Sequence, residues 1–558
     1  MLLGVDVGGT HTDAVILRGE RVIASAKVDT DSQNLICSIS KVLETVLQDI
    51  APQLISRLNL STTLTTNALV EGKTEHVAII VSAGPGMDPE TLRVGNHYFP
   101  VGGAIDHLGL ETAMLNDSEI KSVAGYCKRA NVRTAAIAGK FSTRSPKHEE
   151  HIARILAPDM DHITMGHRLS GHLNFPRRVA TAYYNAAVWR LFNTFADAVE
   201  ESVKACGISA PIDILKADGG TMPLEAARHL PVESILSGPA ASVLGTMALC
   251  NIQNDAVILD IGGTTTDISL FADGSPLIDE NGTRVAAHDT LVRAINGRSV
   301  GIGGDSAITV TKEQGNYILQ VTVGPERFGP CMALGGEHPA LMDAFNTLNS
   351  TGLGDVEASR RGIAELARAH GLSAQELAAK AVKRAVQTIK EAITALLDSV
   401  NSRPVYTIRE LLGKRRISPE QIFIIGGPAE VFARHLAGEL EQKVEIPPLF
   451  SVANAIGTAL ARNTAELELF ADTRQGRLLI PTFGIDRHAP KDYNLETARK
   501  DAVSTMQNLM GELGLRENVP VDITEAYSFN MIDENGLAGR NIRVKCQVRP
   551  GLSGEIKI

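Results

Sequence analysis

The feature that most constrains this chain is a short glycine-rich segment that occurs twice. Residues 6–13 read Asp-Val-Gly-Gly-Thr-His-Thr-Asp, and residues 260–267 read Asp-Ile-Gly-Gly-Thr-Thr-Thr-Asp. Short apolar runs flank each copy, which predicts a strand, a tight turn and a second strand. A single Gly-Gly turn often serves only to reverse the chain. Two copies in one frame indicate an internal duplication with a shared role.

The composition of this segment suits phosphate binding. A turn without bulky side chains lets backbone N–H groups approach a polyphosphate, and threonine hydroxyls add donors. The first aspartate of each copy, Asp6 or Asp260, ends an apolar strand and can hold Mg²⁺, because hard cations prefer carboxylate oxygens. For Asp13 and Asp267 two roles stay open, one near an attacking water and one as a cap of the turn. The expected nucleotide contacts are Gly8, Gly9, Thr10 and Thr12 in the first loop and Gly262, Gly263, Thr264 and Thr265 in the second.

Length and composition exclude several classes of protein. The 558 residues are enough for two to four domains. A net charge of −10 and 4% aromatic residues argue against a nucleic-acid surface. No apolar run reaches the roughly 18 residues of a membrane span, and the chain opens on a core strand, so neither a membrane span nor a signal peptide is expected. Six scattered cysteines without a Cys-x-x-Cys pair favour a reducing, cytoplasmic location.

Strand and helix patterns alternate along the chain, which predicts the α/β class. We expect an N-terminal domain over residues 1–175 with the first loop, and a second domain over 176–466 with the second loop. Residues 467–558 are more polar and end in an alternating strand, so they are predicted to form a separate small α/β domain. The Gly/Pro-rich stretch 82–109 indicates an inserted, loop-bearing subdomain.

This inserted stretch supplies the candidate substrate-binding residues His97, Asp106 and His107, with Asp88 and Arg93 as further candidates. A lone histidine is more often structural than catalytic. Two roles are possible for each of several other polar residues. His167 and His172 are either metal ligands or part of a solvated turn. Lys383 and Arg384 either contact an adenine or form a solvated helix face. Cys331 has no evident base nearby, so a nucleophilic role is not expected.

Taken in their order along the chain, the two glycine loops and the strands and helices around them resemble the actin-like ATPase superfamily. In that superfamily two ribonuclease-H-like halves clamp ATP and Mg²⁺ in a cleft. The two loops resemble its phosphate motifs. The strand and turn at 425–428 resemble its adenosine motif, which implies that Gly426 and Gly427 lie beneath the nucleoside. The glycine cluster with Gly303 and Gly304 is a further expected cofactor contact. The small-residue segment 453–460 resembles the connecting helices, where close packing leaves no space for bulk.

Within the superfamily the closest resemblance is to the A-type, ATP-binding subunit of the hydantoinase/oxoprolinase family, over about residues 1–465. Besides the two loops, the resemblance rests on segments 62–69, 178–186, 237–240, 323–336 and 426–429. The sequence departs from the family pattern at three places. His11 stands where the family usually has phenylalanine, and Asp305 stands where it tends to have a third glycine. The Gly-Pro-Cys stretch at 329–331 is shortened.

The resemblance implies an ATP-dependent hydrolase that opens a cyclic amide or imide, such as a hydantoin, 5-oxoproline or a lactam, by phosphorylating its carbonyl oxygen. It also implies a B-type partner subunit, a homo-oligomer or both. The alternatives are a small-molecule kinase, a subunit of an ATP-dependent ketone carboxylase, and an actin-like ATPase switch. A switch of the iron–sulfur activator kind needs paired cysteines, which the sequence lacks.

Overall fold

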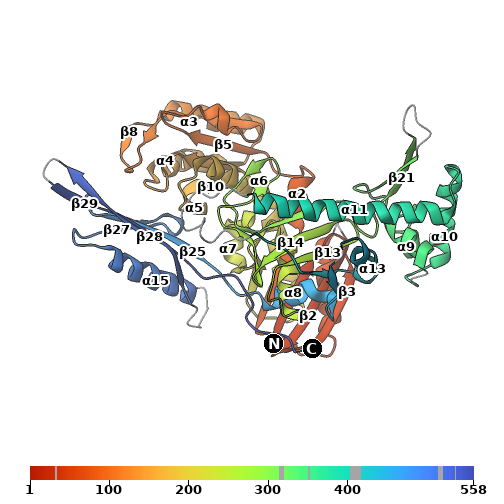
Figure 1. Ribbon diagram of the computed structural model, residues 1–558. Helices are drawn as coiled ribbons and strands as arrows, with labels where there is room; N and C mark the ends of the chain where they lie inside the picture. Colours follow the sequence, from red (N-terminus) through yellow and green to blue (C-terminus); the bar gives the residue numbers. More distant parts are fainter. Residues whose placement is uncertain are drawn as a thin grey trace.

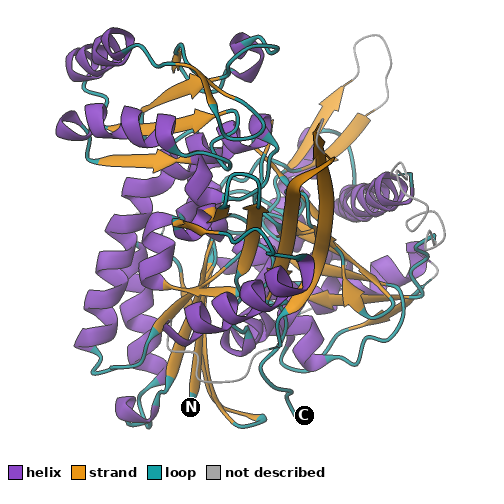
Figure 2. Cartoon of the chain, turned by 90° about the vertical axis from the view of Figure 1, so that its left-hand side faces the viewer, coloured by secondary structure: helices purple, strands orange, loops and turns teal. Residues whose placement is uncertain are grey.

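The chain is built around two sheets of the same construction, with a further subdomain and a C-terminal domain attached (Figure 1). The computed structural model describes residues 1–31, 34–312, 319–349, 352–402, 416–440, 442–512, 520–533 and 536–557. The two ends of the chain lie at the same end of the molecule in both views (Figures 1 and 2).

The first sheet carries the first glycine loop. Its strand order is β12-β11-β4-β1-β2-β3, in which β1 pairs antiparallel with β2 and parallel with β4. The C-terminal half of the long helix α6 (Phe175–Ala205) and the helix α1 (Leu35–Val46) bury apolar residues against this sheet. Its strands are β1 (Leu2–Val7), β2 (His11–Arg18), β3 (Arg21–Asp29), β4 (Arg57–Thr62), β11 (Ile212–Leu215) and β12 (Thr221–Pro223).

The second sheet repeats this arrangement around the second glycine loop. Its order is β15-β14-β13-β23-β24, and β20 pairs with β14 beside β15. Here β13 pairs antiparallel with β14 and parallel with β23, as β1 does with β2 and β4. The internal duplication is therefore present in the fold. The strands are β13 (Ala256–Ile261), β14 (Thr266–Ala272), β15 (Ser275–Pro276), β20 (Gly297–Val300), β23 (Gln421–Ile425) and β24 (Lys443–Glu445).

Helices cover the second sheet because their apolar faces complete its core. Residues of α9 (Leu341–Asn349), α10 (Val356–Ala369), α11 (Ala374–Asn401) and α13 (Ala429–Leu440) share one buried cluster with β13 and β23. A serine cap begins α11, where Ser373 Oγ accepts from the N–H of Glu376 at 3.2 Å. Of these helices, α9, α10 and α11 form the arm that extends to the right in Figure 1.

Two short, small-residue helices pack against each other and contact both halves. They are α8 (Ser237–Leu249) and α14 (Ala453–Leu460). A Cβ atom placed on Gly245 would lie 2.1 Å from the carbonyl oxygen of Ala453, and one on Gly457 would lie 2.3 Å from the N atom of Gly245. One on Gly4 of β1 would lie 2.2 Å from the carbonyl oxygen of Ala455. The close helix packing expected at 453–460 is present.

The inserted subdomain contains a parallel sheet in the order β10-β9-β5-β6, flanked by two helices. Its elements are β5 (Val77–Ser82), β6 (His97–Pro100), β9 (Thr134–Gly139), β10 (His162–Met165), α3 (Asp117–Ala130) and α4 (Lys147–Leu156). The C-terminal domain packs α15 against a sheet in the order β27-β26-β25-β29-β28. Its elements are β25 (Glu466–Asp472), β26 (Arg477–Ile480), β27 (Ile485–His488), α15 (Leu495–Glu512), β28 (Asp522–Asp533) and β29 (Gly536–Gln547).

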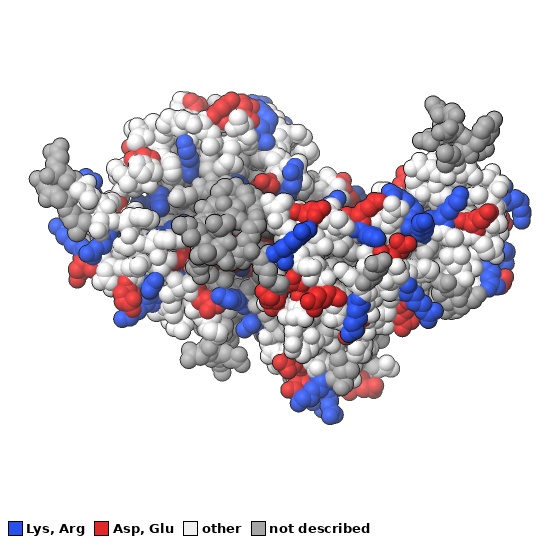
Figure 3. Space-filling view, in the orientation of Figure 1, with Lys and Arg blue, Asp and Glu red and all other residues white. Residues whose placement is uncertain are grey.

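Strands β11 and β12 lie beyond residue 175 in sequence but belong to the first sheet. The domain boundaries at 175 and 466 stay predictions. On the face shown in Figure 3, basic and acidic side chains are interspersed over the described residues. In the part of the chain that the structure describes, no helix combines the length and apolar character that crossing a membrane requires.

Candidate functional site

The tips of the two glycine hairpins face each other. Each turn is closed by a backbone hydrogen bond, from Gly8 N to His11 O at 3.0 Å and from Gly262 N to Thr265 O at 2.9 Å. A Cβ atom placed on Gly263 would lie 3.2 Å from Oγ1 of Thr10. The fold therefore brings together the two loops that the sequence separates.

The first aspartates of the two loops converge on one amide side chain. Asn454 of α14 donates to Oδ2 of Asp260 at 3.0 Å and lies near Asp6, whose carboxylate it helps to stabilise. Asp260 accepts a second hydrogen bond from Ser242 of α8. Ser61 of β4 lies beside Asp6, because the two residues are direct partners in the β1–β4 pair.

The charge at this point is concentrated and poorly solvated. Burial, and then the nearby carboxylates of Asp13 and Asp260, raise the pKa of Asp6 from 3.8 to about 7. Among the described residues Oδ1 of Asp6 has no hydrogen-bond partner. A buried carboxylate oxygen without a donor, close to a second carboxylate, suits a hard divalent cation such as Mg²⁺. The described residues hold no cluster of three or more metal-ligating side chains, so protein ligands beyond Asp6 and Asp260 are not evident.

The second aspartates lie beside the first on the antiparallel strands, Asp13 opposite Asp6 and Asp267 opposite Asp260. Lys27 of β3 contacts both carboxylate oxygens of Asp13 at 2.6 Å. Asp267 lies beside Ser299 on β20, its direct partner in the β14–β20 pair. Asp13 is thus paired with the Lys27 ammonium, whereas the residue beside Asp267 is an uncharged serine. Their proposed catalytic roles stay predictions.

A stability measurement tests the environment of Asp267. Burial, and then the charge of Asp260, raise the pKa of Asp267 from 3.8 to about 7. Because the folded state holds this proton more tightly than the unfolded state, stability is lost as pH rises from about 4 to about 7. We expect chelator-treated protein to show a falling Tm over this range, and Asp267→Asn to flatten the fall. The same dependence of Tm on pH in wild type and in Asp267→Asn would contradict a raised pKa at Asp267.

The adenosine-type turn adjoins the second loop. Since β23 runs parallel to β13, with Ile425 opposite Asp260, Gly426 follows directly beside that aspartate. Gly426 has φ of +93°, and a Cβ atom there would lie 2.2 Å from the carbonyl oxygen of Ile261. No described atom lies within 4 Å of a Cβ atom placed on Gly427. Only glycine therefore fits the backbone at position 426, whereas Gly427 borders open space.

The glycine cluster at Gly303 and Gly304 contacts the second loop rather than open space. Gly304 N donates to Gly262 O at 3.0 Å, and a Cβ atom on Gly303 would lie 2.5 Å from the backbone of Gly263, so this cluster supports the second loop. Thr12 is buried, with its hydroxyl 2.9 Å from that of Thr30.

In the 62–69 segment, β4 ends and α2 (Leu64–Val70) begins. Thr65 Oγ1 lies 3.0 Å from Ser234 Oγ, and the Leu236 N–H donates to Thr66 Oγ1 at 2.9 Å. These hydroxyls therefore tie α2 to the segment before α8.

The predicted substrate residues lie in the inserted subdomain, and their described contacts do not reach the loops. His97 Nδ1 lies 2.9 Å from the hydroxyl of Tyr126. Oδ1 of Asp106 accepts from the N–H groups of Leu108 and Leu110, both at 2.9 Å, which closes a local turn. His107 is exposed and lines a small cavity against the C-terminal domain. A substrate role for these three residues stays a prediction.

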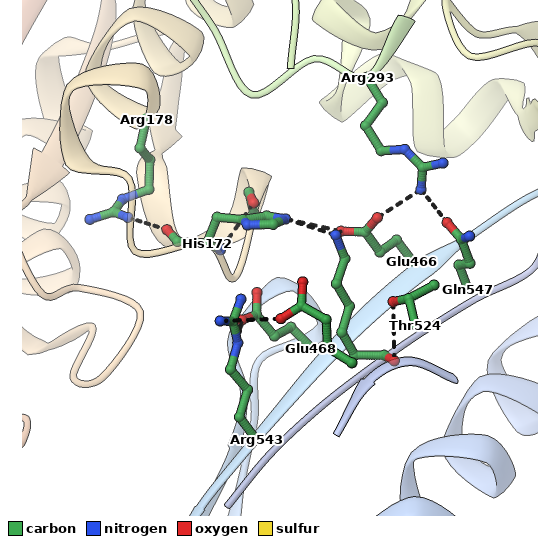
Figure 4. Close-up of polar contacts among 11 residues, drawn as sticks. His172, Arg178, Arg293, Glu466, Glu468, Thr524, Arg543 and Gln547 are labelled. Carbon is green, nitrogen blue, oxygen red and sulfur yellow. Dashed lines mark hydrogen bonds and ion pairs between the residues drawn. The ribbon is translucent and has the colours of Figure 1, made fainter. Parts of the chain in front are cut away.

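Other candidates have structural partners. Asp88 accepts from the N–H of Glu90 at 3.0 Å, and Arg93 pairs with the carboxylate of Glu90 at 2.6 Å. His167 is buried with its Nδ1 2.6 Å from Oε2 of Glu149. Nε2 of His172 lies 3.4 Å from Oε1 of Glu466, in a polar cluster where the C-terminal domain meets α6 (Figure 4).

Of the remaining candidates, Lys383 and Arg384 lie on the exposed side of α11. Arg384 contacts Glu391 at 3.6 Å. Burial, and then the charges of Asp343 and Asp305, raise the pKa of the Cys331 thiol to about 12. A nucleophilic thiolate at neutral pH is therefore disfavoured, as the sequence indicates.

Sequence reasoning missed Ser242 and Asn454, which bind Asp260, and Lys27, which binds Asp13. Asn454 did carry a signal, because it is a lone amide within a helix of small apolar residues. A buried amide needs a hydrogen-bond partner, and the nearby carboxylates supply it. Ser242 and Lys27 have no local pattern that distinguishes them from ordinary helix and strand residues.

Solved structures of similar fold cover nearly the whole chain. A nucleotide-free acetone carboxylase structure matches 99% of this chain and 87% of that chain, with a TM-score of 0.73 and 17% identity. The ATP-dependent caprolactamase of Pseudomonas jessenii matches 100% of this chain and 89% of that chain, with a TM-score of 0.68 and 19% identity. These likenesses confirm the expected fold class, an α/β protein with two duplicated actin-like halves.

Sequence comparison gives the family. An uncharacterized protein of Methanocaldococcus jannaschii, MJ0964, is 24% identical over 82% of this chain and 72% of its own length. The 5-oxoprolinase 1 of Arabidopsis thaliana is 22% identical over 72% of this chain, which spans 36% of the plant protein. The hydantoinase/oxoprolinase N-terminal region model matches residues 2–159, and the hydantoinase/oxoprolinase model matches residues 178–467. The chain belongs to the hydantoinase/oxoprolinase family.

Proposed function

We propose that this chain is the nucleotide-binding component of an ATP-dependent enzyme that opens a cyclic amide or imide. The observation that carries the proposal is the meeting of two glycine loops above a pair of aspartates. Thr10 lies against Gly263, and Asn454 binds Asp260 and lies near Asp6. The names of relatives support the reaction class, since 5-oxoprolinases and a caprolactamase act on cyclic amides.

Each part of the site has a role in this reaction. The N–H groups at both hairpin tips donate to phosphate oxygens, because the glycines leave them accessible. A divalent cation on Asp6 and Asp260 would neutralise phosphate charge. Gly427 borders the space in which the nucleoside is expected. Asn454 and Ser242 hold Asp260 in place.

Activation of the amide explains the need for ATP. The carbonyl oxygen forms a bond to the terminal phosphorus as the bond to the bridging oxygen of ADP breaks. Water then adds to the activated carbon, and the ring nitrogen leaves with a proton, which opens the ring and leaves an acyl phosphate. A second water attacks this carbon, and phosphate departs with the original carbonyl oxygen. Positioning and charge neutralisation supply most of the catalysis in such a transfer.

Isotope transfer tests this reaction. With oxygen-18 in the carbonyl of a lactam, hydantoin or 5-oxoproline, the label should appear in the released phosphate. Mass spectrometry of phosphate and product measures this directly, with and without a B-type partner subunit. Label that stays wholly in the organic product while ATP is consumed would exclude the mechanism and favour a kinase or an ATPase switch.

A ketone carboxylase is the second candidate, favoured by the fold match to acetone carboxylase. It would share activation of a carbonyl oxygen but require bicarbonate. ATP consumption that depends on both a ketone and bicarbonate, without ring opening of any cyclic amide, would select it. A partner subunit, a homo-oligomeric state and a cytoplasmic location belong to the proposal as predictions.

Gly427→Val tests the nucleoside position. Because no described protein atom lies within 4 Å of the added Cβ, the side chain should enter the ligand space rather than displace protein. We expect at least about tenfold weaker ATP binding by calorimetry with Tm within about 2 °C of wild type, since 1.4 kcal/mol is a factor of ten. In contrast, Gly426→Ala should lower Tm, because its Cβ would meet the backbone of Ile261. Unchanged ATP affinity in Gly427→Val would make this glycine part of a simple turn.

A further inference from the structure

The three places where this sequence departs from the family pattern come together in the folded chain. Oδ1 of Asp305 accepts a hydrogen bond from the N–H of Cys331, at the end of the shortened Gly-Pro-Cys stretch, at 3.0 Å. The Asp305 carboxylate also lies at the tip of the first loop, since its Oδ2 is 2.9 Å and Oγ1 of Thr10, the residue before His11, is 3.2 Å from a Cβ atom placed on Gly263. One carboxylate therefore links all three departures.

The other oxygen of this carboxylate holds an arginine. Oδ2 of Asp305 accepts from a terminal nitrogen of Arg327 at 2.8 Å. The segment that carries Arg327 is fixed on both sides, since Ala307 N donates to Glu326 O at 2.9 Å and Cys331 N binds Asp305. The Asp305 side chain is 8% exposed and the Arg327 side chain 30% exposed. The guanidinium is thus anchored by a buried group and still open to solvent.

This ion pair lies against the tips of the phosphate loops. Asp305 N donates to Gly263 O at 2.7 Å. A Cβ atom placed on Gly263 would lie 2.9 Å from Oδ2 of Asp305 and 3.2 Å from Oγ1 of Thr10. The carboxylate oxygen that binds Arg327 therefore lies beside both loop tips. Without its ion pair, the Asp305 carboxylate would repel a polyphosphate at this place, so the charge of Arg327 is needed to offset it.

We infer that Arg327 is a catalytic cation that binds the terminal phosphate of ATP, and that Asp305 is its positioning residue. The inference rests on the proposed function and adds a residue that the resemblance did not single out. A guanidinium is planar with five donors, so it can bind Asp305 through one nitrogen and phosphate oxygens through the others. An arginine at the transferring phosphoryl group stabilises the charge that spreads over its oxygens.

A simpler role would leave Arg327 as a counter-ion that only neutralises Asp305. The two roles differ when both residues are removed together. Replacing Asp305 by the glycine typical of the family abolishes the repulsion, so Asp305→Gly/Arg327→Ala needs no counter-ion. If Arg327 binds phosphate, the double variant still lacks that donor.

The experiment compares affinities for MgADP and for MgADP with aluminium fluoride, which mimics the transferring phosphoryl group. Calorimetry is applied to the full chain without any cyclic amide, so the result does not depend on the amide substrate. The variants are Arg327→Ala, Arg327→Lys and Asp305→Gly/Arg327→Ala. The control is Arg360→Ala, which removes an exposed arginine of α10 paired with Glu357.

We expect Arg327→Ala to bind the aluminium fluoride complex at least about 30-fold more weakly than wild type. Its affinity for MgADP should fall by less than about threefold, because the arginine contacts the phosphoryl group more strongly in the transition state than in the ground state. The double variant should show the same selective loss of affinity. Arg327→Lys should bind the aluminium fluoride complex about tenfold more weakly, because an ammonium cannot reproduce the planar fork of a guanidinium. If Arg327→Ala does not fold, Arg327→Lys carries the test. Arg360→Ala should match wild type.

Wild-type affinity for the aluminium fluoride complex in the double variant would overturn the inference and leave Arg327 as a counter-ion. Unchanged affinity in Arg327→Ala, or in Arg327→Lys where that variant carries the test, would also overturn it. Both results leave the proposed function intact. A wild-type protein that binds no adenine nucleotide would overturn the proposed function and the inference together.

Discussion

Asp260→Asn is expected to reduce ATP turnover by at least about a thousandfold, the scale of a lost charge-stabilising group in phosphoryl transfer. The variant removes one of the two carboxylates available to the cation. Its fold should persist, because the amide oxygen of asparagine can still accept from Ser242 and Asn454. Turnover is measured across a Mg²⁺ titration, with Tm as the measure of folding. Asp6→Asn should reduce ATP turnover to a similar extent, also without loss of the fold.

A matched control separates loss of a cation ligand from loss of an aspartate. Asp355 caps α10, with Oδ1 accepting from the N–H of Ala358 at 2.9 Å, and asparagine caps helices about as well. Asp355→Asn should therefore keep both turnover and Tm. Turnover in Asp260→Asn and Asp6→Asn within about threefold of wild type would contradict the placement of the cation.

Gly457→Val is expected to cost at least about 3 kcal/mol of unfolding free energy, at the upper end of overpacking effects. The added Cβ would lie 2.3 Å from Gly245 N and 2.4 Å from the carbonyl oxygen of Ala241. Both are backbone atoms of α8, so no side chain can rotate away, and the two helices must separate. Urea unfolding measures the change.

The same variant should impair turnover even where it folds. Ser242 of α8 and Asn454 of α14 both bind Asp260, so a shift between these helices displaces the carboxylate. Gly438→Val is the control, because Gly438 lies in α13 and no described atom is within 4 Å of its added Cβ. Equal urea midpoints for the two variants would show that the contact between α8 and α14 tolerates bulk.

The sequence by itself determined the duplicated hairpins. Alternating apolar runs around a Gly-Gly turn specify a local structure, and β1–β2 and β13–β14 formed as predicted. The small residues of α14 likewise predicted close packing, since only such residues let helix backbones approach. These features are encoded within about ten neighbouring residues, which is why a single sequence reveals them.

Only the tertiary structure decided which side chains share the site. Asn454 reaches Asp260 across 194 positions of sequence, and Arg327 reaches Asp305 because the antiparallel strands Ile308–Lys312 and Leu319–Val323 bring the chain back. His97, Asp106 and His107 have the composition of site residues, yet their described contacts lie within the inserted subdomain or toward the C-terminal domain. Such contacts depend on how separate elements pack, and no local pattern of residues records that packing.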